Sequence, residues 1–183
     1  KMPPFQYHLQ LRDHFKKQQK TWNWFAQNKV KTEQAEKFKL ELLQNTYRLD
    51  PASEKEVYRL LEKAKETLEI DRKVTVYQAN YSPDTNAAVS FTEEEVSIVL
   101  SGQMLKLEEK ELRAVLAHEL AHICLFVIQN GDFEVTDRIV SSIADDYSSP
   151  EAYRETARLY SLFTELYCDF GALKVCGNAE VVI

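Results

Sequence analysis

Apolar residues recur at helical spacing through the first part of the chain. The spacing predicts one or two helices over about residues 7–29 and a helical stretch that ends at Asp50-Pro51. Ser53 and Glu56 then have the spacing of a capping box, in which each side chain accepts a backbone N–H of the other residue. A third helix should therefore begin near Ser53, and residues 1–72 are predicted to form a helical segment.

Polar and apolar residues alternate in the middle of the chain, which is the pattern of half-buried strands. The alternation is clearest over residues 73–77 and 96–100, and residues 86–91 form a shorter extended candidate. Helical spacing then returns from Glu109 onward. Two or three strands followed by helices predict a mostly helical α+β fold, with a small sheet ahead of the later helices.

Three helices are predicted in the last part of the chain. The first covers about residues 109–129 and stops at Gly131, where a left-handed conformation would end it. The second covers about residues 133–147. The third begins at Ser149, which would cap it, and runs to a second helix-ending glycine at Gly177.

The first of these helices contains the motif His118-Glu119-Leu120-Ala121-His122. Residues four apart lie on one face of a helix, so both imidazoles can reach one metal ion while Glu119 stays close without binding it. Two histidines can share a helix by chance, and a structural zinc site is a further alternative. Structural sites usually use paired cysteines, and the three cysteines here form no C-x-x-C pair. We therefore predict a catalytic type of Zn²⁺ site with one ion.

A site of this type needs a third protein ligand, and no histidine follows His122. Glu165 and Asp169 lie four residues apart among apolar neighbours in the last predicted helix. One carboxylate could bind zinc, and the other could accept the free N–H of a ligand imidazole. The alternatives are a solvated acidic face or a ligand drawn from three other acidic residues, Asp145, Asp146 and Glu155.

Together, the segment at Asn86-Ala87, the H-E-x-x-H helix and the run Glu165-x-x-Cys168-Asp169 resemble a known family. This family is the group of gluzincin metallopeptidases that includes the protease HtpX and the CAAX prenyl endopeptidases. The resemblance covers roughly residues 74–177. It implies a zincin-like fold, Glu165 as the third zinc ligand and Asp169 as the residue that orients a histidine ligand. It also implies a sheet edge that pairs with extended substrate, formed by Asn86, Ala87 and Ala88. Cys168 stands where the family usually has alanine, as a compact apolar replacement.

The expected function is zinc-dependent endopeptidase activity on a peptide or protein substrate, with Glu119 as the general base. The expected division is a helical segment over residues 1–72, which packs on or regulates a zincin-like domain over residues 73–183. Donors to the oxyanion could come from four tyrosines, Tyr147, Tyr153, Tyr160 and Tyr167. The alternative function is a catalytically weak or latent zincin-fold module that binds or regulates a partner.

Composition and charge limit the classes of partner that the protein can be expected to bind. The 183 residues are 44% hydrophobic and 28% charged, as in ordinary soluble proteins, and no apolar run is long enough to cross a membrane. Residues 1–40 carry a net charge of +6, and the remaining residues carry −12. Because most of the chain is acidic, nucleic-acid binding is not expected. The basic, aromatic first segment could contact a membrane surface or an acidic partner, or could simply pack on the domain. Three cysteines without framework spacing predict a cytoplasmic protein, with an exported mature protein as the alternative.

Overall fold

The computed structural model describes residues 2–92 and 95–182, without the side chains of residues 28–35, 128–129 and 181. It confirms the mostly helical α+β fold. The α-helices are α1 (Gln6–Lys17), α2 (Gln19–Ala26), α3 (Asn28–Asn45), α4 (Lys55–Leu68), α5 (Glu109–Val127), α6 (Asp132–Asp145) and α7 (Glu151–Cys176). The strands are β1 (Thr46–Arg48), β2 (Lys73–Ala79), β3 (Ala87–Phe91) and β4 (Glu95–Leu100). Single 3₁₀ turns are η1 (Met104–Lys106), η2 (Ile128–Gly131) and η3 (Ala179–Val181).

The four strands form one mixed sheet in the order β1-β2-β4-β3. The central strands β2 and β4 are parallel, and each pairs with an antiparallel neighbour at the edge. The strand β1 corrects the prediction that residues 1–72 are helical throughout, because Thr46 pairs with Ala79 and Arg48 with Tyr77. Three residues are too few to show the alternation of a strand, so only the pairing with β2 identifies β1.

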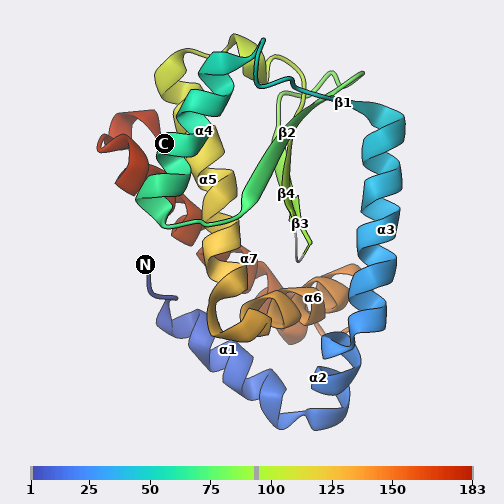
Figure 1. The fold of residues 1–183 in the computed structure, drawn as a ribbon. Helices are drawn as coiled ribbons and strands as arrows, with labels where there is room; N and C mark the ends of the chain where they lie inside the picture. The colour runs from blue at the N-terminus through green and yellow to red at the C-terminus, as the bar shows by residue number, and fades with distance from the viewer. Residues whose placement is uncertain (1, 93–94, 183) are drawn as a thin grey trace.

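Helices α4 and α5 lie on one side of the sheet, and α3 stands on the opposite side (Figure 1). The core between the sheet and the two helices is made of fully buried aliphatic residues, among them Leu60, Leu61, Val76, Ile98 and Leu116. Tyr58 of α4 adds a polar link, since its hydroxyl donates to the Leu49 carbonyl at 2.9 Å. Residues 46–72 thus share one core with later residues, while the division of the chain at residue 73 stays a prediction.

Two predicted helix caps are wrong. Helix α4 begins at Lys55 with no side-chain cap, and the Ser53 hydroxyl instead donates to Asp50 Oδ2 at 3.2 Å. At the start of α7, the Ser149 hydroxyl likewise donates to Asp146 Oδ2 at 3.2 Å. In both cases the serine hydroxyl donates to a carboxylate three residues upstream, because a charged acceptor makes a stronger hydrogen bond than a neutral one.

The predicted ends of two helices are confirmed by their backbone conformations. Asn130 and Gly131 follow α5 with φ angles of 57° and 82°. Gly177 follows α7 with a φ of 68°, and its N–H donates to the Leu173 carbonyl at 2.8 Å. Helix α7 therefore ends in the left-handed conformation that glycine adopts without strain, and Gly131 closes in the same conformation the 3₁₀ turn η2 that continues α5.

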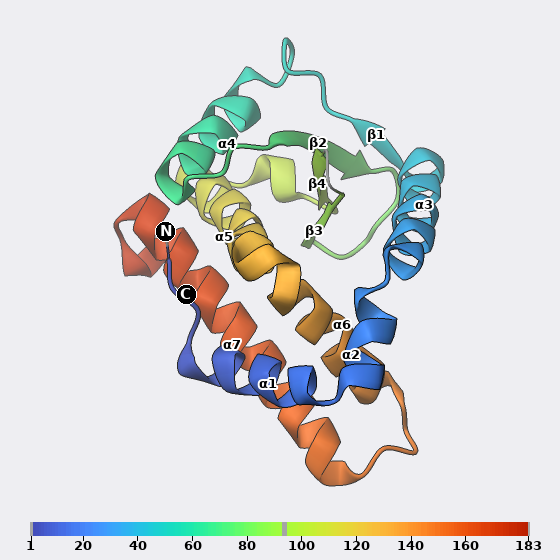
Figure 2. The ribbon, with the colours of Figure 1, turned by 60° about the horizontal axis from the view of Figure 1, so that its bottom comes forward.

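Helix α7 packs along α5 and is crossed by α1 on its other side (Figure 2). Helices α5 and α7 approach closely at Gly171. A Cβ placed on Gly171 would lie 2.5 Å from the Cβ of Ala121, well inside van der Waals contact. The absence of a side chain at this position therefore sets how near the two helices lie.

The basic first segment packs its aromatic residues on the domain. Phe15 is buried against α6 and α7, and Trp22 and Phe25 are partly buried in the same cluster. Trp24 stays exposed. Among the described residues, none of the helices combines the length and apolar character that crossing a bilayer requires. Contact of this segment with a partner or a membrane surface stays a prediction.

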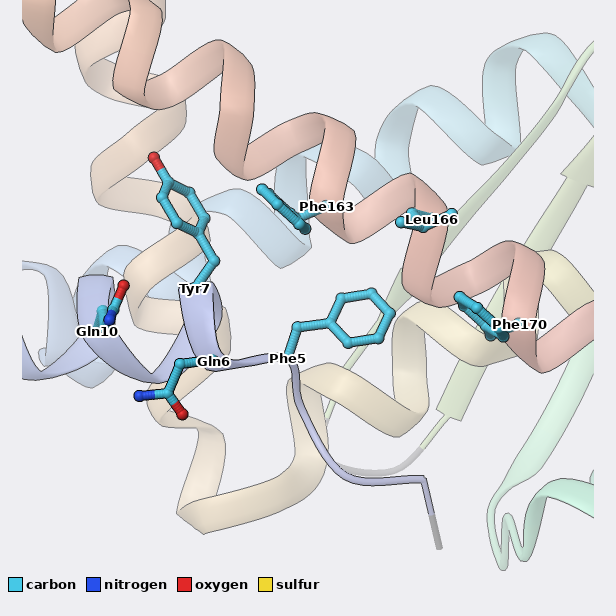
Figure 3. Close-up of a pocket in the computed structure, with 7 residues that line it drawn as sticks. All are labelled: Phe5, Gln6, Tyr7, Gln10, Phe163, Leu166 and Phe170. Carbon is cyan, nitrogen blue, oxygen red and sulfur yellow. The ribbon is translucent and has the colours of Figure 1, made fainter.

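A shallow cavity of about 410 Å³ lies between α1 and α7 (Figure 3). Its walls are aromatic and aliphatic, with two amides, and are formed by Phe5, Gln6, Tyr7, Gln10, Phe163, Leu166 and Phe170. Phe5 points toward α7, and Tyr7 stacks on Phe163 with 4.9 Å between the ring centroids. No imidazole, carboxylate or thiol lines this cavity, so it does not contain the groups expected to carry the chemistry.

His8 is the polar anchor of α1 and is 0% exposed. The Phe5 N–H donates to its Nδ1 at 3.3 Å, so the ring proton is on Nε2, which lies 3.3 Å from Thr164 Oγ1. The rings of Tyr160 and Tyr167 meet it edge to face. Burial in this aromatic setting lowers the pKa of His8 from 6.5 to about 4.

The low pKa of His8 predicts acid sensitivity of the fold. Between pH 6.5 and 4 the unfolded chain binds a proton at His8 and the folded chain does not, so stability falls as the pH falls. The loss in free energy of unfolding should reach roughly 3 kcal/mol at the lower pH. Denaturant unfolding at several pH values should show a shallower pH dependence in His8→Asn, which keeps an acceptor for the Phe5 N–H and does not titrate.

The control is His14→Asn, because His14 is an exposed histidine on the same helix. This variant should keep the pH dependence of the wild-type protein. An identical pH dependence in wild type and His8→Asn would contradict the assignment.

The contact at Gly171 predicts a specific packing defect. Gly171→Ala should lower the free energy of unfolding by about 1–3 kcal/mol, because the added methyl group forces α7 away from α5. Ala121→Gly removes the atom that the new methyl group meets. The double variant should therefore lose less stability than the sum of the two single changes in a double-mutant cycle, whereas strict additivity would argue against the contact.

Candidate metal centre

Helix α5 presents the two motif histidines on one face. His118 and His122 are one turn apart, with 5.4 Å between their ring centroids, and both are partly buried. Their neighbours on the opposite face, Leu116 and Leu120, are fully buried in the main core. The buried apolar face of α5 thus fixes the helix on the core, and its opposite face leaves the imidazoles at the edge of the core.

Helix α7 brings both predicted carboxylates to these imidazoles. Glu165 Oε2 lies 3.1 Å from His118 Nε2, and Glu165 Oε1 lies 3.8 Å from His122 Nε2. Asp169 Oδ1 lies 2.9 Å from the other ring nitrogen of His118, Nδ1. One carboxylate therefore meets both Nε2 atoms, and the other accepts the Nδ1–H of His118, which fixes the orientation of that ring.

The competing acidic residues are engaged elsewhere. Asp145 is exposed at the end of α6, and Asp146 Oδ1 accepts hydrogen bonds from the N–H and hydroxyl of Ser148. Glu155 is paired with Arg158 at 2.7 Å. The acids on the face of α7 that meets α5 are thus the ones placed to act with the histidines.

Glu119 is buried beside this cluster and is 8% exposed. Burial, with a smaller contribution from the Glu165 carboxylate, raises its pKa to about 7. The His118 imidazole acts in the opposite direction on the same carboxyl group, which shows that the groups are close enough to interact. A carboxyl group that titrates near neutral pH can both accept and return a proton.

The two imidazoles differ in their electrostatic setting. Burial lowers the pKa of His122. Burial also opposes protonation of His118, but hydrogen bonding to Glu165 and the nearby carboxylates outweigh it and raise its pKa. The hydrogen bond from His118 in turn lowers the pKa of Glu165. Three carboxyl groups around two imidazoles make a site that favours added positive charge.

Cys168 is a further ligand-type residue that sequence reasoning placed only as an apolar replacement. Its Sγ and one ring nitrogen each of His118 and His122 lie within 4.8 Å of one another, and its side chain is fully buried. The available signal was its spacing, because Cys168 follows Glu165 by three residues and so shares a face of α7 with it.

The predicted substrate strand approaches His122 through its last residue, Phe91, whereas the predicted residues Asn86, Ala87 and Ala88 lie at the opposite end of the strand. Phe91 of β3 stacks on Phe126 of α5 with 5.7 Å between centroids, and Phe126 stacks on His122 with 6.0 Å. β3 is an edge strand, and no described strand pairs with its outer side. The sheet edge and the imidazoles are thus joined by a continuous row of aromatic contacts.

The tyrosines considered as oxyanion donors do not converge on the cluster. The hydroxyl of Tyr160 donates to the Phe133 carbonyl at 3.4 Å, and that of Tyr167 donates to the Met2 carbonyl at 3.0 Å. Tyr147 and Tyr153 are exposed on the surface. The structure therefore does not assign the oxyanion donor to any of the four.

The donor set fits a zinc ion. Two imidazole nitrogens and a carboxylate oxygen are the ligands of many catalytic zinc sites, and Asp169 supports His118 in the way that such ligands are usually held. The nearby carboxylates offset the charge of a divalent cation. The three cysteines form no disulfide, so Cys168 keeps a free thiol.

Comparison with known proteins finds a likeness to a different family from the one that the motifs suggested. Residues 54–136 match the model of the SprT-like family, a span that includes α4, the strands β2 to β4 and α5 with its H-E-x-x-H motif. No curated protein and no solved structure matches the chain. The narrower resemblance to HtpX and the CAAX prenyl endopeptidases is not supported. Residues 54–136 are therefore similar to the SprT-like family, which is of the zincin-like metallopeptidase type.

Proposed function

We propose that this protein is a zinc-dependent endopeptidase with Glu119 as its general base. The observation that carries the proposal is the approach of Glu165 and Asp169 to opposite nitrogens of His118, beside the buried carboxyl group of Glu119. The match to the SprT-like family supports the same chemical class. The finer assignment, to a gluzincin, rests on Glu165 as the third ligand.

Three side chains would hold the metal: His118, His122 and Glu165. Zinc bound there would act as a Lewis acid and lower the pKa of water from 15.7 to about 7. Asp169 accepts the Nδ1–H of His118, which keeps Nε2 of that ring free to coordinate. The role of Asp169 is thus to position the ligand.

Glu119 is placed to move the proton during hydrolysis. Its carboxylate would take a proton from the attacking water and pass it to the leaving amine of the cleaved peptide bond. Burial holds its pKa at about 7, so the proton can be accepted and returned at neutral pH without a large energy difference.

The outer edge of β3 would bind the substrate backbone. The Ser101 N–H donates to the Asn86 carbonyl at 2.8 Å, so Asn86 directs its backbone carbonyl toward the β4 side. Residues alternate along an antiparallel strand, so the backbone groups of Ala87 and Val89 point to the free edge. The Ala87 N–H already donates to Asn86 Oδ1 at 2.9 Å, which leaves Val89 to offer its N–H to a peptide. An extended peptide could add there as a further strand, with affinity that depends little on its sequence.

A latent or weakly catalytic binding module is the second candidate. The observation in its favour is the placement of the tyrosine hydroxyls, since those of Tyr160 and Tyr167 are used in bonds to backbone carbonyls. A site that binds zinc without a second oxyanion donor would hydrolyse peptides slowly, because such a donor is worth several kcal/mol.

Replacing the proposed general base distinguishes the endopeptidase from the binding module. Glu119→Gln should lower kcat for hydrolysis of casein or a peptide library by about 10²–10⁴-fold, because the amide cannot accept the proton. Zinc content by metal analysis and helix content by circular dichroism should stay at the wild-type values. Equal inactivity of wild type and variant, with zinc bound in both, would favour the binding module.

The metal site has its own control in the same assay. Glu165→Ala should sharply reduce the zinc bound per chain, whereas Glu155→Ala, an exposed carboxylate on the same helix, should not. Full zinc content in Glu165→Ala would exclude Glu165 as a ligand.

If the substrate pairs with the outer edge of β3, proline substitutions at outward and inward positions of the strand should affect KM and Tm differently. Val89→Pro removes an N–H that points to the free edge, so KM should rise about fivefold, the value of one lost hydrogen bond, while Tm changes little. Ala88→Pro removes an N–H directed at β4 and should instead lower Tm. A wild-type KM in Val89→Pro would contradict pairing at this edge.

A further inference from the structure

Cys168 differs from the other two cysteines in its surroundings. Cys168 Sγ and one ring nitrogen each of His118 and His122 lie within 4.8 Å of one another, close enough to share a metal ion. Cys124 instead directs its thiol to the Leu68 carbonyl at 3.7 Å. Cys176 is the last residue of α7. One thiol out of three is therefore placed against the histidines.

The packing of α7 keeps the Cys168 thiol near these histidines. Cys168 is 0% exposed and lies in a cluster with Ala121 of α5. Gly171, one turn further along α7, allows close contact between the two helices at the same alanine. A buried side chain between two closely packed helices has little room to turn away.

Glu165 and Cys168 lie on the same face of α7 but differ in how deeply their side chains are buried. The Glu165 side chain is about half exposed at the rim, and Cys168 is buried beneath it. Sulfur and nitrogen ligands of one tetrahedral zinc ion lie roughly 3.5 Å apart, given bond lengths near 2.3 and 2.0 Å. The ligand atoms lie within 4.8 Å of one another, so small rotations of the partly exposed imidazoles would bring them to this separation while Cys168 stays in place.

We propose that Cys168 is a fourth protein ligand of the zinc site, together with His118, His122 and Glu165. This inference rests on the zinc site of the proposed function. Coordination forms one bond between Sγ and the metal, and the thiol proton leaves to solvent. Four protein ligands make a closed site, whereas catalytic zinc sites keep one position open for water. Binding of Cys168 therefore holds the proposed peptidase in a latent form.

Cobalt substitution tests the sulfur ligand without relying on activity. A thiolate bound to Co²⁺ gives a charge-transfer absorption band in the near ultraviolet, and imidazole or carboxylate ligands do not. The wild-type protein loaded with one Co²⁺ per chain should show this band. Cys168→Ala and Cys168→Ser should lose it, while Cys124→Ala and Cys176→Ala should keep it at full intensity.

Each outcome bears on a different claim. Bound cobalt without the band in the wild-type protein would overturn Cys168 as a ligand and leave the zinc site intact. No binding of cobalt or zinc at all would overturn both this inference and the proposed function. Circular dichroism of the two Cys168 variants verifies their folding, and the serine variant keeps nearly the volume of the thiol.

Hydrolysis gives the second readout. Opening the fourth position in Cys168→Ala should make cleavage of a peptide library at least roughly tenfold faster per bound zinc than in wild type. Cys124→Ala should cleave at the wild-type rate. A rate in Cys168→Ala equal to or below that of wild type would overturn the latent form, even where the cobalt band confirms the ligand.

Discussion

The proposed chemistry depends on the close packing of α5 against α7. Gly171 allows the backbone of α7 to approach Ala121, and this approach sets the height at which Glu165 and Asp169 meet His118. The histidines are carried by one helix and the carboxylates by the other. The cluster therefore exists only when the two helices pack at this distance, and the buried aliphatic core behind α5 supplies the energy that holds them there.

The electrostatics of the cluster follow from where that packing leaves each group. Glu119 is buried, so its neutral form is favoured and its pKa rises to about 7. Glu165 lies half exposed and is stabilised as an anion by its hydrogen bond from His118. Burial of one glutamate and hydrogen bonding of the other thus suit them to different tasks: Glu119 is placed to carry a proton and Glu165 to donate electrons to a cation.

Cys168 shows how a conservative change of size can alter the chemistry of such a site. A thiol fills little more space than a methyl group, and it also adds a soft ligand between the two helices. Whether it coordinates decides whether the site is open or closed, and hence which of the two proposed functions describes the resting protein.

The sequence by itself determined the features that depend on local spacing. The periodicity of α5 placed His118 and His122 on one face, the spacing of Glu165 and Asp169 placed both on one face of α7, and the terminal glycines ended both helices. Local patterns misled where a nearby group competed for the same side chain, as Asp50 does for the hydroxyl of Ser53. Strand β1 was missed because three residues are defined only by the strand they pair with. Only the tertiary structure decided that Asp169 meets Nδ1 of His118, that Glu165 reaches both imidazoles and that the Cys168 thiol lies among them. Those contacts join residues about fifty positions apart, and their distances are set by how closely two helices pack, which no spacing along a single helix encodes.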